Sequence, residues 1–146
     1  MSGARAEQTV VWTMRQLALG FAVVGILFIV TPDGVVDTID DLGDQLGSFT
    51  HGPVSDEKLW VALSFAYMTV ITGIAIVVSL DPVRFRPMLL VLAAGKAASS
   101  LAAGAYFVWS DDVFIYLLNF IVDGALVGVA LACWALAGRA AARAPG

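Results

Sequence analysis

The chain has little of what soluble enzymes and metalloproteins are built from. Only 14% of its 146 residues are charged, whereas roughly 25% are charged in ordinary soluble domains. One cysteine excludes an internal disulfide and every metal site that needs several cysteines. One histidine excludes haem ligation by two histidines. No catalytic or cofactor motif stands out, so we expect no enzyme activity, no metal and no cofactor.

Apolar residues are what the chain has in excess, at 60% of the sequence and a mean hydropathy of +0.88. Since a helix of about 20 apolar residues spans a bilayer, four stretches are long enough to cross it: 11–30, 59–80, 87–109 and 113–137. The linkers 81–86 and 110–112 are so short that the helices on either side of each must run antiparallel. The sequence predicts an all-α integral membrane protein, a single domain over residues 1–146 that folds as an antiparallel bundle of four transmembrane helices.

Basic residues are distributed unevenly among the ends of these stretches. Those on one side of the predicted membrane are all arginines, namely Arg5, Arg15, Arg84, Arg86, Arg139 and Arg143. The other side has Lys58 among many aspartates. Because arginine and lysine concentrate in cytoplasmic loops, we expect both termini to be cytoplasmic. The preference for arginine over lysine, with much alanine and glycine, is typical of the coding bias of GC-rich bacterial genomes. It therefore favours a bacterial inner membrane.

The linker between the first two stretches has a helical pattern of its own. Over residues 34–49, apolar residues recur at helical spacing, and four aspartates occupy the other face: Asp37, Asp40, Asp41 and Asp44. This pattern predicts an amphipathic, acidic helix at the outer surface. We interpret the acidic face as solvated. A site for a divalent cation or a basic partner is the alternative, although the ligand and glycine spacing of a calcium loop is missing.

Two ionisable residues lie in the middle of apolar stretches. Lys96 and Asp123 are nine and ten residues from the starts of the third and fourth stretches, which run in opposite directions. At about 1.5 Å per residue, both lie near the middle of a hydrocarbon core of about 30 Å, so their depths nearly coincide. Because an ionisable side chain at that depth is costly, it normally has a partner or a function. We favour a structural ion pair that fixes helix register; a proton or ion relay, or a polar pocket, is the alternative.

Further polar residues share the helix faces of this pair. Asn119 lies one turn before Asp123, while Ser99 and Ser100 lie one turn after Lys96. Serine hydroxyls within helices most often bond to carbonyls of their own preceding turn, and we expect this of both serines. A relay usually has more than one carboxylate along its path, and Asp123 is the only one here.

Small residues in the last two stretches indicate close helix packing. Gly95 and Gly104 lie in the third stretch, and Gly124 and Gly128 lie in the fourth. Glycine lets the backbones of apolar helices approach, and this packing replaces the hydrophobic driving force that is absent in lipid. The approaching helix can belong to this chain, to another subunit or to a second copy.

One short segment resembles a known family. Residues 15–21 (RQLALGF), in a first helix that ends at a proline, are similar to small four-helix membrane proteins of the DoxX type. The resemblance covers one helix and implies the same number of helices. It carries no functional residue.

Three classes of function remain. The favoured one is a non-catalytic integral membrane subunit or accessory protein that packs against a larger membrane complex. The second is a small oligomeric transporter or channel that uses Lys96 and Asp123. A membrane enzyme is disfavoured because no nucleophile with a base and no metal cluster can be named. We expect the lipid bilayer, other subunits or further copies as partners, and no nucleic acid.

Overall fold

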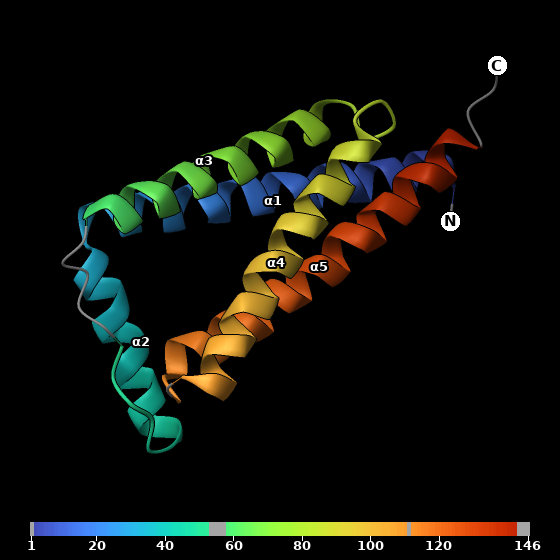
Figure 1. Ribbon diagram of the computed structural model, residues 1–146. Coiled ribbons are helices and arrows are strands. Elements are labelled where there is room, and N and C mark those ends of the chain that lie inside the picture. Colours follow the sequence, from blue (N-terminus) through green and yellow to red (C-terminus); the bar gives the residue numbers. More distant parts are fainter. Residues whose placement is uncertain (1, 53–57, 111, 143–146) are drawn as a thin grey trace.

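A computed structural model describes residues 2–52, 58–110 and 112–142, which form five helices (Figure 1). In chain order they are α1 (Gly3–Val30), α2 (Pro32–Leu46), α3 (Lys58–Leu80), α4 (Arg86–Trp109) and α5 (Phe114–Ala141). These residues form no strand, and their one extended pairing is an isolated bridge between Thr50 and Val113. The predicted all-helical fold is confirmed for the part of the chain that the structure describes.

Four of these helices are long and apolar enough to cross a membrane, namely α1, α3, α4 and α5. This confirms the four predicted candidate spans. α2 has only 15 residues, too few for a crossing that takes about 20. α3 and α4 begin one residue earlier than the apolar stretches, and α2 covers 32–46 instead of 34–49.

The first and last spans, α1 and α5, extend further than the apolar stretches that predicted them. α1 begins at Gly3 because Ser2 caps it: the backbone N–H of Arg5 donates to the Ser2 hydroxyl at 3.4 Å. The first turns contain alanine, arginine, glutamate and glutamine, which favour helix without being apolar. α5 likewise continues to Ala141, past the predicted end at residue 137. Hydropathy alone therefore underestimated both helices.

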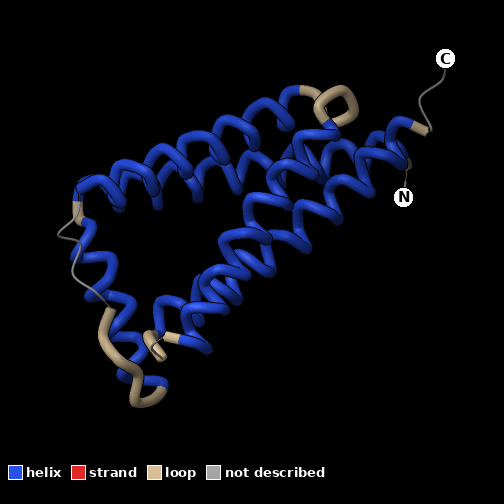
Figure 2. Tube along the Cα trace, in the orientation of Figure 1, coloured by secondary structure: helices blue, strands red, loops and turns tan. Residues whose placement is uncertain are grey.

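The long helices form two antiparallel pairs that meet at one end of the molecule and diverge toward the other (Figure 1). α1 packs along α3, and α4 packs along α5. α3 and α4 contact each other far less, although only a short turn joins them. α2 crosses the open end between the end of α1 and the start of α5, as Figure 2 also shows. A single evenly packed antiparallel bundle is therefore not confirmed.

The apolar core lies in the half of the molecule where the two pairs meet. Its fully buried side chains come from all four long helices, and they include Val10, Met14, Ala75, Val78, Leu89, Leu92, Ala130 and Ala137. Arg86 strengthens the same end, because its Nε donates to the carbonyl of Trp134 at 2.9 Å. Its guanidinium also lies 3.9 Å from the centroid of the Trp134 ring, a cation–π contact.

Most of the described arginines lie at the end of the molecule where the two helix pairs meet. Arg5 is in the first turn of α1, Arg84 and Arg86 are at the turn between α3 and α4, and Arg139 is near the end of α5. Arg143 lies outside the described residues. The aspartates of α2 lie at the opposite end (Figure 1).

α2 is held at the open end by contacts with the start of α5. A Cβ on Gly43 would stand 2.9 Å from the Cβ of Phe114, so the helices touch where glycine leaves room. The segment after α2 adds a ring contact between Phe49 and Phe114, with centroids 5.0 Å apart. The Thr50 hydroxyl donates to the Asp112 carboxylate at 3.0 Å. These contacts fix α2 across the gap between the two helix pairs.

Candidate functional site

Lys96 of α4 and Asp123 of α5 form a buried ion pair. Nζ lies 2.8 Å from Oδ1, and the two side chains are 3% and 6% exposed. Lys96 is ten residues into α4 and Asp123 nine residues into the antiparallel α5, so the helical rise brings them to the same height. Each charge offsets part of the other's desolvation cost, and neither could be buried alone without a penalty of several kcal/mol.

Two aromatic rings from the other helix pair also lie close to the ammonium. Nζ of Lys96 lies 4.9 Å from the ring centroid of Phe21 on α1 and 5.3 Å from that of Tyr67 on α3. Both distances are within the range of a cation–π contact. Lys96 and Asp123 therefore lie where all four long helices meet. These rings were not predicted from the sequence, because a single aromatic ring in an apolar stretch has the pattern of an ordinary packing residue.

Two further hydrogen bonds join α4 to α5 beside the ion pair. The Ser100 hydroxyl donates to the carbonyl of Phe120 at 2.7 Å, and Nδ2 of Asn119 donates to the Ser99 hydroxyl at 3.2 Å. The prediction that Ser100 bonds within its own helix is wrong. α4 and α5 are close enough here for the hydroxyl to reach the facing backbone. The five predicted polar residues are thus brought together.

The four predicted packing glycines divide into two groups. A Cβ on Gly104 would stand 2.8 Å from the Phe120 ring, one on Gly124 would stand 3.3 Å from the Ser100 hydroxyl, and one on Gly95 would stand 3.5 Å from the Tyr67 hydroxyl. These glycines face other helices of the chain. Gly128 differs, because nothing lies within 4 Å of where its Cβ would be.

A cavity of about 490 Å³ extends from the ion pair toward α2. Lys96, Asp123 and Asn119 contribute to one part of its lining. The rest is mostly apolar and comes from every helix, with Val35 and Ile39 of α2 among the lining residues. Because the apolar core occupies the other half of the molecule, the cavity reaches the ion pair from the α2 side.

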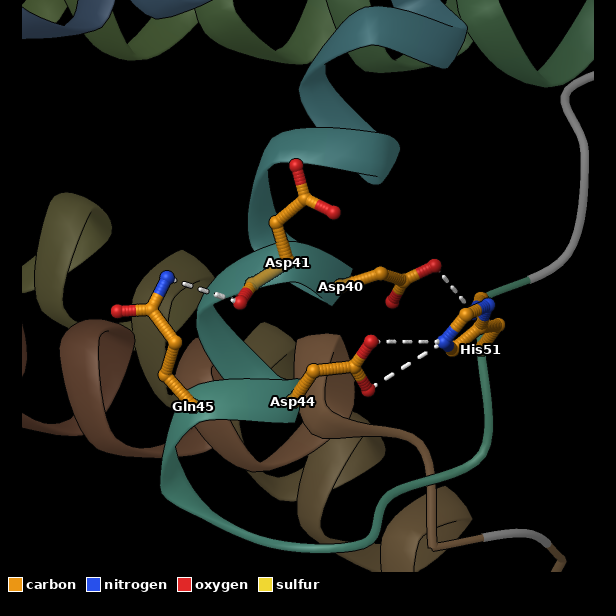
Figure 3. A network of polar contacts seen from close by, with 6 residues as sticks. Asp40, Asp41, Asp44, Gln45 and His51 are labelled. Atoms are coloured by element: carbon orange, nitrogen blue, oxygen red, sulfur yellow. Dashed lines mark hydrogen bonds and ion pairs between the residues drawn. The ribbon is translucent and has the colours of Figure 1, made fainter.

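The acidic face of α2 is only partly solvated, and the segment after α2 supplies contacts to Asp40 and Asp44 (Figure 3). Asp37, Asp41 and Asp44 are exposed, and Asp44 accepts a 3.3 Å contact from Nε2 of His51. Asp40 is 8% exposed, so the prediction of a solvated side chain is wrong for this residue. Its Oδ2 accepts a hydrogen bond from the backbone N–H of Gly52 at 2.8 Å. Asp40 thereby ties the segment after α2 back onto the helix.

No metal centre is evident in the described part of the chain, where no three histidine, cysteine, aspartate or glutamate side chains are grouped to hold an ion. Asp44 and Asp40 instead contact a ring nitrogen and a backbone amide of the following segment.

Comparisons with protein-family models, with curated proteins and with solved structures found no match to this chain. The resemblance of residues 15–21 to DoxX-type proteins therefore has no support from a family model. Function has to be inferred from the geometry of the chain itself.

Proposed function

We propose that the protein is a non-catalytic integral membrane subunit or accessory protein that packs against a larger membrane complex. Its four apolar helices would cross a bacterial inner membrane, with α2 at the outer surface and both termini in the cytoplasm. The apolar length of the helices and the arginines near one end of the molecule support this placement.

The observation that carries the proposal is a row of small residues on α4 that the described chain leaves uncovered. Ala94, Ala98 and Ala102 follow one another at a spacing of four residues, and all three are exposed. The face of α4 that packs against α5 contains Ser100 and Gly104 instead. A row of small residues allows another helix to approach closely, whereas contact with lipid chains does not need it. We call Ala94, Ala98 and Ala102 the outer small-residue row.

Two apolar side chains of α2 also favour a partner. Leu42 and Leu46 are 44% and 66% exposed, although α2 is not one of the candidate spans. The helix therefore turns leucines outward while its Gly43 faces Phe114. A second protein at the outer surface would cover these leucines and gain the free energy of burying them.

Purification in a mild detergent followed by native mass spectrometry tests the proposal. We expect a complex with a different subunit at a fixed stoichiometry. Ala98→Trp should release that subunit, because the indole fills the outer small-residue row. Leu19→Trp, on an exposed part of α1, is the matched control and should leave the complex intact. A protein recovered only as copies of itself contradicts the proposal.

One observation favours a second function, a small oligomeric transporter or channel. The cavity reaches the Lys96–Asp123 ion pair from the α2 side, and the core closes the other side, as expected of one state in alternating access. Four helices seldom enclose a path alone, so this function would require self-association. Liposomes with the purified protein should then show ion or proton flux, and the Lys96→Met, Asp123→Asn double variant should not.

A further inference from the structure

The cavity beside the Lys96–Asp123 ion pair has the composition of a ligand site. Its volume of about 490 Å³ lies within the roughly 300–1,000 Å³ of small-molecule pockets. Such pockets are mostly apolar and have a few placed polar groups. Here the apolar lining includes Phe28 and Leu126, and the residues with polar groups are the ion pair, Asn119 and Tyr116.

The charge of the polar part selects among possible ligands. Lys96 and Asp123 neutralise each other at 2.8 Å, so the site has no net charge to offset a charged head group. A head group with a net charge would lose its hydration without gaining a counter-ion, which is costly in apolar surroundings. An uncharged hydroxyl or carbonyl oxygen costs much less to bury, and a hydrogen bond from the ammonium offsets that cost. The ammonium has three N–H donors, and its contact with Asp123 Oδ1 uses one of them.

The volume sets the length of the apolar part. A water molecule occupies about 30 Å³ of liquid, so the cavity holds roughly sixteen groups of that size. A methylene group is comparable to a water in size. One alkyl chain of moderate length therefore fills the cavity, whereas the second chain of a phospholipid would lie outside it.

We propose that this cavity binds an uncharged, lipid-soluble molecule with one moderate-length apolar chain and a hydroxyl or carbonyl oxygen, which bonds to the Lys96–Asp123 pair. The apolar chain lies between the two helix pairs, and α2 covers it through Val35 and Ile39. Binding of this molecule requires neither a partner subunit nor flux through the protein.

Three probes with the same chain test the proposal: dodecanol, dodecanoate and dodecylammonium. Each is titrated against the purified full-length protein, and bound probe is counted by native mass spectrometry. The parent protein should bind one dodecanol at least about tenfold more tightly than either charged probe. Asp123→Asn, which leaves the ammonium uncompensated, should move the preference toward dodecanoate. Lys96→Met should move it toward dodecylammonium.

A pair of neighbouring tryptophan variants locates the binding. Val122 lines the cavity and is 46% exposed, whereas Ile121 is 57% exposed and does not line it. Val122→Trp should abolish dodecanol binding, and Ile121→Trp should retain it. These two variants and the ranking of the probes by the parent protein suffice if the charge variants do not fold. Equal binding of the three probes, or equal binding by Val122→Trp and Ile121→Trp, overturns the proposal and indicates adsorption on the lipid-facing surface.

Discussion

Lys96 of α4 contacts residues on each of the other three long helices. Its ammonium meets a carboxylate on the neighbouring helix and two aromatic rings on the other helix pair. Depth along the helices was enough to predict from the sequence that Lys96 and Asp123 could meet, because both positions follow from counting residues. The contacts with Phe21 and Tyr67 could not be predicted that way. They depend on how the two helix pairs are rotated against each other.

Removing one member of the ion pair should destabilise the protein strongly. Lys96→Met leaves a buried carboxylate and Asp123→Asn leaves a buried ammonium, so each should cost about 3–5 kcal/mol of unfolding free energy. The double variant should recover much of this loss. Unfolding in mixed detergent micelles measures the cycle, with the exposed Lys58→Met as a control that changes stability little. Strictly additive losses would show that the two side chains do not interact.

Asp40 and Asp41 are adjacent aspartates that should respond differently to substitution. Asp40→Ala removes the acceptor of the Gly52 N–H and should cost about 1–3 kcal/mol. Asp41→Ala changes an exposed side chain and should have an effect within about 0.5 kcal/mol. Limited proteolysis around residues 47–52 provides the readout, since this segment should be cut faster only in Asp40→Ala. Equal cleavage of the two variants contradicts the assigned contact.

At the level of elements, hydropathy predicted the helices well and their contacts poorly. α3 and α4 begin one residue from the predicted starts because charged or proline residues mark the ends of their apolar stretches. The start of α1 was missed because Ser2 and the polar turn after it extend the helix without adding apolar residues. The burial of Asp40 was missed because helical periodicity does not tell which face of α2 the segment 47–52 covers.

Replacing two of the predicted packing glycines with alanine should change the stability of the protein in opposite directions. Gly104→Ala places a methyl group 2.8 Å from the Phe120 ring and should destabilise the α4–α5 contact. Gly128→Ala meets open space, so its effect should be the gain from replacing glycine in a helix, about 0.5–1 kcal/mol. Thermal unfolding of both variants in detergent measures the difference. A destabilised Gly128→Ala in the isolated protein would contradict the open surroundings of this glycine.

On the scale of the whole molecule, the core and the cavity follow one another along the space between the two helix pairs, and Phe21, Met68 and Leu126 border both. One half is filled by apolar side chains and ends in the arginines, and the other half opens toward α2. The short linkers in the sequence predicted antiparallel neighbours, but a short linker fixes only the ends that it joins. The divergence of α3 from α4 is a property of packing along their length. No pattern in the linkers specifies it.

The proposal that another membrane protein covers the outer small-residue row can be tested most directly in cells. A photoreactive amino acid at Ala98 lies in that row, and the same amino acid at Leu19 lies on an exposed part of α1. Irradiation should give one discrete crosslinked product with a different membrane protein from position 98 and none from position 19. A product from position 98 that contains only a second copy of this chain, or the same products from both positions, would contradict the proposal.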